Sequence, residues 1–242
     1  MSQDTSASPL TVVLVHGAFA DSSSWAGVIA RLQAAGVPVI AAANPLRGIS
    51  FDSAYVASVI DQVPGPVLVV GHSYGGAVIS NAATGKRNVV GLVYVAAFAP
   101  DEGETLNDVT ASSRDSVLGT ALVPHQYPSG NGTGTEFSID PAKAREAFAA
   151  DLADAQAAVI GVIQRPVADL AFGEPNGVPA WKTLPSWAVV ANNDRAAGTD
   201  VVRAHAQRAG ATITEIDGSH VIMISQPDIV TQVIESAIAK VS

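Results

Sequence analysis

The chain alternates between short runs of apolar residues and longer segments in which apolar and polar positions recur with a helical spacing. Apolar runs this short and rich in valine predict buried strands, which we expect at residues 11–15, 37–42, 67–70, 89–96, 187–191 and 212–216. The segments between them predict helices at residues 23–35, 53–63, from about 73 onward, 200–209 and 227–241. This alternation is typical of a mostly parallel sheet of about six strands with helices on both faces, which defines an α/β fold.

Residue types at the helix ends agree with this pattern. Gly36 and Gly210 follow two of the predicted helices, and glycine commonly ends a helix. Asp52 stands before a predicted helix as an N-cap, and Pro227 opens the last one, where a missing N–H costs little.

The alternation stops between residues 100 and 185. Residues 101–134 are polar and interrupted by glycine and proline, whereas 141–162 are rich in alanine and predict helix, so no buried strand is expected here. We therefore predict a single domain, 1–242, with a core of residues 10–99 and 186–242 and an inserted helical lid at 100–185. Ligands bind at the carboxyl edge of open parallel sheets, where this lid should lie. A helical insertion without ligand contact is the alternative.

One turn of the core carries candidate chemistry. The segment Gly71-His72-Ser73-Tyr74-Gly75-Gly76 joins a predicted buried strand to a predicted helix. Small residues flank Ser73, as a sharp strand-to-helix turn requires, and such a turn raises a serine hydroxyl above the carboxyl edge of the sheet. A G-x-S-x-G string also arises by chance in a glycine-rich chain, so an inert turn serine is the alternative until partner residues are found.

A serine hydroxyl becomes a strong nucleophile only beside a base, and the base needs an orienting carboxylate. We select His220 as the base, because it follows the last predicted strand through a turn and should hang over the carboxyl edge. A turn histidine bonded to nearby carbonyls is the alternative. The other four histidines are assigned different places: His16 bracing the loop after the first strand, His72 pointing away from the face of Ser73, His125 in the lid, and His205 exposed on a helix.

The expected acid is Asp194, which lies in the loop after the strand at 187–191. The chain order of serine, acid and histidine also agrees with this kind of fold. Asp200, at a predicted helix start, and Asp217, awkwardly close to His220 along the chain, are the rivals. An aspartate that merely caps the next helix is the other alternative.

Backbone N–H groups complete the predicted site. The N–H of Tyr74, at the start of the helix, and the N–H of Ala18, in the turn after the first strand, should bind an oxyanion. Apolar aromatic side chains are candidates to line a substrate pocket, with ordinary core packing as the alternative for each: Phe19, Phe98, Tyr127, Phe148 and Trp181.

Composition and charge narrow the possible partners. The net charge is −9 and no basic cluster is present, which argues against nucleic acid or an anionic membrane as a partner. The absence of cysteine excludes disulfides, thiolate metal sites and a cysteine nucleophile. Residues 1–9 lack the basic start of a signal sequence, and the first apolar run is too short to span a membrane, so a cytoplasmic protein is expected. Either a monomer or a homodimer is compatible with the sequence.

Taken together, these motifs resemble the small α/β-hydrolases, which include bacterial carboxylesterases, plant methyl-ester esterases and hydroxynitrile lyases. The resemblance covers the chain except most of the lid, and it is carried by Val13-Leu14-Val15-His16-Gly17-Ala18, Trp25, the segment around Ser73 and Gly218-Ser219-His220. It implies a triad of Ser73, Asp194 and His220, oxyanion donors at Ala18 and Tyr74, and no metal or organic cofactor.

The resemblance also implies a reaction, the hydrolysis of a small, moderately apolar carboxylic ester through an acyl-enzyme. Hydroxynitrile lyases of this family carry a lysine just after the catalytic histidine, whereas this chain has Val221, as in the related esterases. Dehalogenases and epoxide hydrolases of this fold use an aspartate where Ser73 stands. A lyase or other non-hydrolytic enzyme, and a non-catalytic protein that binds a small ligand, are the alternatives.

Overall fold

A six-stranded parallel sheet, in the order β2-β1-β3-β4-β8-β9, forms the centre of the computed structural model, which describes residues 8–130 and 132–242. The expectation about a signal sequence falls largely on residues 1–7, which lie outside this range. All six predicted strands are confirmed, most with ends shifted by one or two residues: β1 (Thr11–Val15), β2 (Val39–Ala42), β3 (Val67–His72), β4 (Val89–Val95), β8 (Ser186–Ala191) and β9 (Thr212–Ile216).

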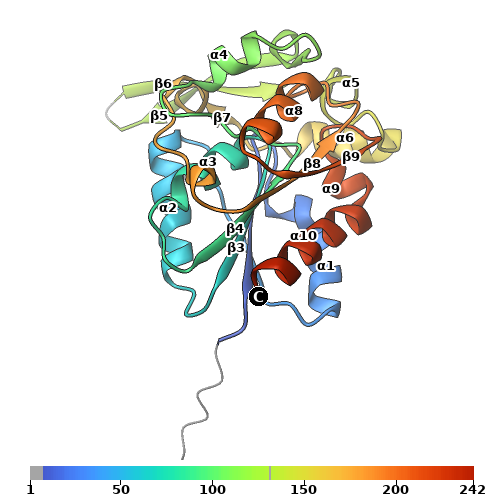
Figure 1. Cartoon of the computed structure of the whole chain (residues 1–242). Coiled ribbons are helices and arrows are strands. Elements are labelled where there is room, and N and C mark those ends of the chain that lie inside the picture. Colours follow the sequence, from blue (N-terminus) through green and yellow to red (C-terminus); the bar gives the residue numbers. More distant parts are fainter. Residues whose placement is uncertain (1–7, 131) are drawn as a thin grey trace, which may run out of the picture.

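Helices cover both faces of this sheet, as Figure 1 shows. One face carries α1 (Ala26–Ala34), α9 (Ile222–Ser225) and α10 (Pro227–Val241), and the other carries α2 (Ile49–Asp61), α3 (Tyr74–Ala82) and α8 (Thr199–Arg208). Because side chains alternate along a strand, Val12 and Leu14 of β1 pack into one hydrophobic cluster and Val13 and Val15 into the other. Burial on both faces explains why the inner strands read as nearly continuous apolar runs, whereas the edge strands β2 and β9 are only partly buried.

The predicted helix ends are confirmed at Gly36 and Gly210, which both have positive φ, and α10 spans residues 227–241 as expected. The prediction that Asp52 caps a helix is wrong, because α2 begins one turn earlier, at Ile49. The buried Asp52 carboxylate instead accepts hydrogen bonds from the backbone N–H of Arg47 at 3.0 Å and from the hydroxyl of Tyr74 at 2.7 Å.

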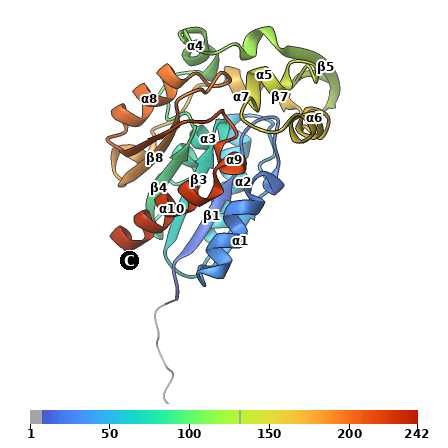
Figure 2. The same cartoon turned by 90° about the vertical axis from the view of Figure 1, so that its right-hand side faces the viewer.

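The segment between β4 and β8, called the lid below, lies over the carboxyl edge of the sheet (Figure 2). It contains helices, as expected, and also a three-stranded antiparallel sheet in the order β5-β6-β7 that the sequence did not predict. Strands β5 and β6 are polar, contain proline and glycine, and are mostly exposed or half-buried. They therefore lack the apolar run from which a buried strand is predicted. The elements of the lid are α4 (Leu106–Ala111), β5 (Leu122–Ser129), β6 (Gly132–Ile139), α5 (Ala144–Phe148), α6 (Asp154–Val162), β7 (Val167–Ala168) and α7 (Leu170–Gly173), and the 3₁₀ turns of the chain are η1 (Ser22–Trp25), η2 (Leu118–Thr120) and η3 (Ala180–Lys182).

The lid is fastened to the core by the loop after β2. Arg47 pairs with Glu136 of β6 at 2.6 Å, and its guanidinium lies 4.6 Å from the ring centre of Tyr127. The carbonyl of Leu46 accepts a hydrogen bond from the N–H of Ala168 in β7. These contacts fix the lid sheet above the carboxyl ends of the core strands.

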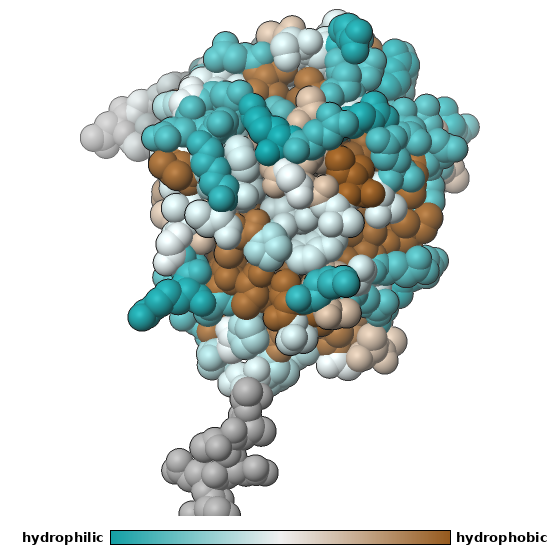
Figure 3. Space-filling view, viewed as in Figure 1, coloured by the Kyte–Doolittle hydropathy of each residue, from teal (hydrophilic) through white to brown (hydrophobic). Residues whose placement is uncertain are grey.

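Polar side chains dominate the upper part of the surface in Figure 3, which the lid forms, while hydrophobic residues gather in smaller patches between them. Among the helices of the described residues, none combines the length and the apolar character needed to cross a membrane.

The expectation that His205 is exposed is wrong, since only 6% of this residue is accessible to solvent. Its Nδ1 accepts a hydrogen bond of 2.9 Å from the N–H of Ala99, and its ring packs against Phe98. The helical spacing explains this burial, because His205 lies three and four residues after Val202 and Val201, on the face of α8 that is turned to the core. Burial lowers the pKa of His205 to about 4.

The depressed pKa of His205 predicts a loss of stability in mild acid. Between the folded pKa of about 4 and the unfolded value of about 6.5, only the unfolded chain binds a proton at this ring. Stability therefore falls as the pH drops below 6.5, and at pH 5 the loss amounts to about 2 kcal/mol for this group. In urea unfolding at pH 7 and pH 5, His205→Asn should lose less stability on acidification than the wild type by about this amount. His125→Asn, at an exposed position, is the control and should follow the wild type. An equal pH dependence in all three proteins would contradict the assignment.

Candidate active site

Ser73 sits at the sharp turn between β3 and α3, with φ 53° and ψ −124°, a conformation that strains a residue with a side chain. Close packing explains the glycines around it. A Cβ on Gly75 would lie 2.5 Å from the carbonyl oxygen of Val15, and a Cβ on Gly17 would lie 2.7 Å from the Cβ of Ser73. The loop after β1 is therefore pressed directly against the turn that holds Ser73.

His220 and Asp194 come together beneath the lid. His220 follows β9, is 1% exposed, and donates a hydrogen bond of 2.8 Å from Nδ1 to Oδ2 of Asp194. The other carboxylate oxygen accepts the backbone N–H groups of Ala196 and Ala197, each at 2.9 Å. These donors hold the carboxylate in one orientation. The acid engages Nδ1 of His220, so Nε2 is the ring nitrogen that it leaves free.

His72 links His220 to the turn of Ser73. The Nε2–H of His72 donates to the backbone carbonyl of His220 at 3.0 Å, and the two ring centres are 4.7 Å apart. Burial holds the pKa of His72 well below its usual value, so this ring stays neutral. In the part of the chain that the structure describes, neither the Ser73 hydroxyl nor Nε2 of His220 takes part in a hydrogen bond, and neither is a fully enclosed polar atom.

The two predicted oxyanion donors have no competing acceptor within the described residues: the backbone N–H groups of Ala18 and Tyr74 donate no hydrogen bond there. Residue 74 is also anchored by its side chain, because its buried hydroxyl donates to Asp52 at 2.7 Å. Burial raises the pKa of the Tyr74 hydroxyl well above its usual value, and the Asp52 charge acts in the same direction.

A cluster of aromatic rings extends from His220 on the lid side. The ring of Phe148 lies 5.0 Å from that of His220, and Phe19 packs against Phe148 at 6.2 Å and against Phe172 at 6.5 Å. Phe19 and Phe148 were expected at the pocket. Phe172 was not selected, because the sequence alone could not place this part of the lid over the core.

The structure gives the three other aromatic candidates different contacts. Phe98 packs against His205, and Tyr127 lies under Arg47 at the edge of the lid. Trp181 donates its indole N–H to the carbonyl of Pro100 and is flanked by the cations Lys182 and Arg208. None of these side-chain contacts involves Ser73, Asp194 or His220, although the backbone N–H of Phe98 donates to the carbonyl of Ser73 at 3.2 Å.

The remaining candidates also have local roles. His16 braces its loop as predicted, since its Nε2 accepts the N–H of Asn44 at 3.0 Å while the Asn44 amide donates to the carbonyl of His16. Burial lowers the pKa of His16 to about 4. Of the rival acids, Asp200 accepts hydrogen bonds from Ser113 and Arg114 at the start of the lid, and Asp217 accepts one from Asn192.

A contact that the sequence did not indicate ties the lid to the residue before His220. Asp151, between α5 and α6, accepts hydrogen bonds from both the N–H and the hydroxyl of the buried Ser219. Burial opposes the charge of Asp151, but these hydrogen bonds outweigh it and lower its pKa. The lid therefore helps to hold the loop that carries His220.

Asp151→Ala should lower the free energy of unfolding by about 1 kcal/mol, because it leaves the N–H of the buried Ser219 without an acceptor and its hydroxyl with only the carbonyl of Phe148 at 3.5 Å. Urea denaturation measures this loss. Asp154→Ala is the matched control, since the side chain of Asp154 is 91% exposed and pairs with the exposed Arg145, and it should change stability by less than about 0.5 kcal/mol. An equal change in the free energy of unfolding for the two variants would show that the contact of Asp151 with Ser219 does not stabilise the fold.

Within residues 8–130 and 132–242, no three histidine, aspartate or glutamate side chains are placed to share a metal ion.

The chain belongs to the alpha/beta hydrolase family, whose family model matches residues 12–233. No curated protein matches its sequence. Among solved structures, it is similar to polyneuridine aldehyde esterase, with a TM-score of 0.81 at 19% identity over 95% of this chain and 100% of the other. It is also similar to a pyrethroid hydrolase from Sphingobium faniae, with a TM-score of 0.77 at 20% identity over 96% of this chain and 98% of the other.

A third similar structure is an extracellular alpha/beta-hydrolase from a Paenibacillus species, with a TM-score of 0.74 at 20% identity over 95% of this chain and 99% of the other. At these identities the likeness establishes the shared fold. The family and the fold thus agree with the resemblance seen in the sequence motifs.

Proposed function

We propose that the protein is a serine esterase that hydrolyses small, moderately apolar carboxylic esters, with Ser73 as nucleophile, His220 as base and Asp194 as orienting acid. The observation that carries this proposal is the buried 2.8 Å hydrogen bond between His220 and Asp194, which His72 connects to the strained strand-to-helix turn of Ser73. Similar structures described as an esterase and a pyrethroid hydrolase support the same reaction class.

In the first half-reaction, Nε2 of His220 takes the proton of the Ser73 hydroxyl as its oxygen attacks the ester carbonyl. The N–H groups of Ala18 and Tyr74 stabilise the oxyanion that develops. Asp194 fixes the proton on Nδ1 and stabilises the imidazolium. His220 then returns the proton to the leaving alcohol, and Ser73 is left acylated.

In the second half-reaction, His220 takes a proton from water, which attacks the acyl carbonyl, and Ser73 regains its proton as the acid leaves. The aromatic rings of Phe19, Phe148 and Phe172 present an apolar surface beside His220, which favours an uncharged, moderately apolar substrate. No step requires a metal or an organic cofactor.

The chain's own residues favour hydrolysis over cyanohydrin cleavage. A lyase of this kind needs a cation beside the base to stabilise leaving cyanide, and the position after His220 holds the buried, apolar Val221. An unpaired charge buried at this position would cost free energy, so the position suits a neutral side chain.

Hydrolysis of p-nitrophenyl butyrate, together with labelling by a fluorophosphonate, tests the proposal. The purified protein should release p-nitrophenol, and peptide mass spectrometry should find the phosphonyl group on Ser73. Cleavage of mandelonitrile without ester turnover would support the lyase instead. Binding of small ligands with neither turnover nor labelling would support a non-catalytic role.

A further inference from the structure

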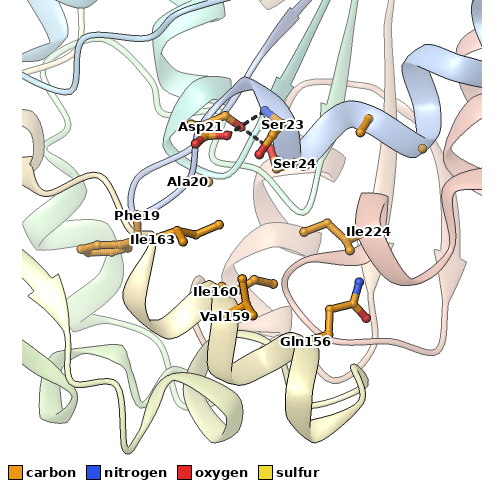
Figure 4. A pocket seen from close by; sticks show the side chains of 12 residues that line it. Phe19, Ala20, Asp21, Ser23, Ser24, Gln156, Val159, Ile160, Ile163 and Ile224 are labelled. Carbon is orange, nitrogen blue, oxygen red and sulfur yellow. Dashed lines mark hydrogen bonds between the residues drawn. The ribbon is translucent and has the colours of Figure 1, made fainter.

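A pocket of about 360 Å³ opens between the loop after β1, η1 and the lid helix α6 (Figure 4). Five larger apolar side chains line it, and a volume of this size is enough for a small organic group. These side chains are Phe19, Val159, Ile160, Ile163 and Ile224.

The polar groups of the pocket are grouped on one side and bonded to one another. Asp21 accepts the N–H of Ser23 at 2.7 Å on its carboxylate and the hydroxyl of Ser24 on its carbonyl, as Figure 4 shows. Hydrogen bonds from Ser23 lower the pKa of Asp21, so the carboxylate stays charged. A negative charge at the rim opposes an anionic ligand, and the remaining wall suits a neutral hydrocarbon group.

The pocket lining does not include Ser73, Asp194 or His220, but two of its residues lie close to the candidate active site along the chain. Phe19 directly follows Ala18, the expected oxyanion donor, and its buried ring contacts Phe148, which in turn contacts His220. Ile224, on the opposite wall, lies in α9, which begins two residues after His220. Phe19 therefore stands between the pocket and the candidate active site, and an ester held at Ser73 would reach the pocket past this ring.

The apolar wall is left partly open to solvent. Gln156, Val159, Ile160 and Ile163 recur at the spacing of a single helix face and all line the pocket. Val159 is 54% exposed and Ile163 is 53% exposed. Grouped exposed apolar side chains beside a pocket are typical of a surface that a ligand covers.

We propose that this pocket binds an elongated hydrocarbon arm of a neutral ester, carried on either its acyl or its alcohol side. The inference rests on the proposed esterase activity, and it names the substrate class: esters with a medium-length aliphatic chain or a second aromatic ring rather than small esters alone. Phe19 forms the wall shared by the pocket and the reaction site.

Binding can be measured apart from catalysis, in the Ser73→Ala protein with the neutral dye N-phenyl-1-naphthylamine. Saturable binding is expected, and Val159→Glu should weaken it about tenfold by placing a charge in the apolar wall. Val162→Glu is the matched control: Val162 is on the same helix, is 72% exposed and lies outside the pocket lining, so binding should be unchanged. Ile163→Glu should repeat the loss. Absence of saturable binding, or equal effects at 159 and 162, would overturn the proposal.

Two ester series then decide which side of the substrate carries the arm. In the otherwise wild-type protein, kcat/KM should rise with chain length either across p-nitrophenyl esters from acetate to octanoate or across alkyl acetates from methyl to octyl. Val159→Glu should flatten that rise and Val162→Glu should keep it. Short esters hydrolysed at full rate with no length dependence in either series would overturn the pocket assignment and leave the esterase standing. Dye binding that depends on Val159 without hydrolysis of any ester would retain the pocket and refute the esterase.

Discussion

Ser73→Ala is expected to lower kcat for p-nitrophenyl ester hydrolysis about a millionfold, because the base and acid of such a unit accomplish little without the nucleophile. The backbone at this position has φ 53°, which alanine tolerates no better than serine, so the fold should survive with nearly unchanged stability. Stopped-assay kinetics with a fluorogenic ester measure the residual rate, and thermal unfolding confirms that the variant is folded.

Two further variants separate chemistry from strain at this turn. Ser73→Gly should be equally inactive, yet it should raise the free energy of unfolding by about 1 kcal/mol, because glycine adopts this backbone conformation without strain. Ser58→Ala, at an exposed position of α2, should retain full activity. A Ser73→Ala protein that is as active as the wild type would refute the assignment of the nucleophile.

Asp194→Asn is expected to lower kcat about ten-thousandfold while leaving the geometry largely intact, since an asparagine can no longer hold the proton of His220 on Nδ1. The rate should recover partly at high pH, where hydroxide can take the proton of the Ser73 hydroxyl in place of the imidazole. The pH profile of kcat/KM from pH 5 to pH 10 measures both effects.

Asp217→Asn supplies the matched control for this prediction. Asp217 is only three residues from His220 but contacts Asn192 instead, and its replacement should change the rate by no more than about twofold. A large loss in Asp217→Asn together with a small one in Asp194→Asn would transfer the role of the acid to Asp217.

The core of the fold was predictable because a strand that is buried on both faces of a parallel sheet consists of a nearly continuous run of apolar residues. The apolar runs of β1, β3 and β8 are typical of strands that are covered on both faces, and glycines mark the ends of α1 and α8. Strands β5 and β6 contain no such run. They are held by pairing with each other and by Arg47, which lies far away in the sequence.

The site divides in a similar way. Ser73 follows the buried strand β3 and His220 follows the edge strand β9, so their place at the carboxyl edge could be derived from local pattern and chain order. The aromatic surroundings could not. Phe172 and Phe148 reach the active-site side only because the lid folds back over the core, whereas Phe98 and Trp181, equally aromatic, pack elsewhere.

The sequence by itself determined the parallel sheet, the strained turn of Ser73 and the strand ends from which Asp194 and His220 project, because each depends on residues that are neighbours along the chain. Only the tertiary structure decided which side chains meet across the chain: Asp151 with Ser219, Asp52 with Tyr74, and Phe19 with the apolar face of α6. The physical reason is that such contacts depend on the packing of the lid, to which no short-range periodicity corresponds.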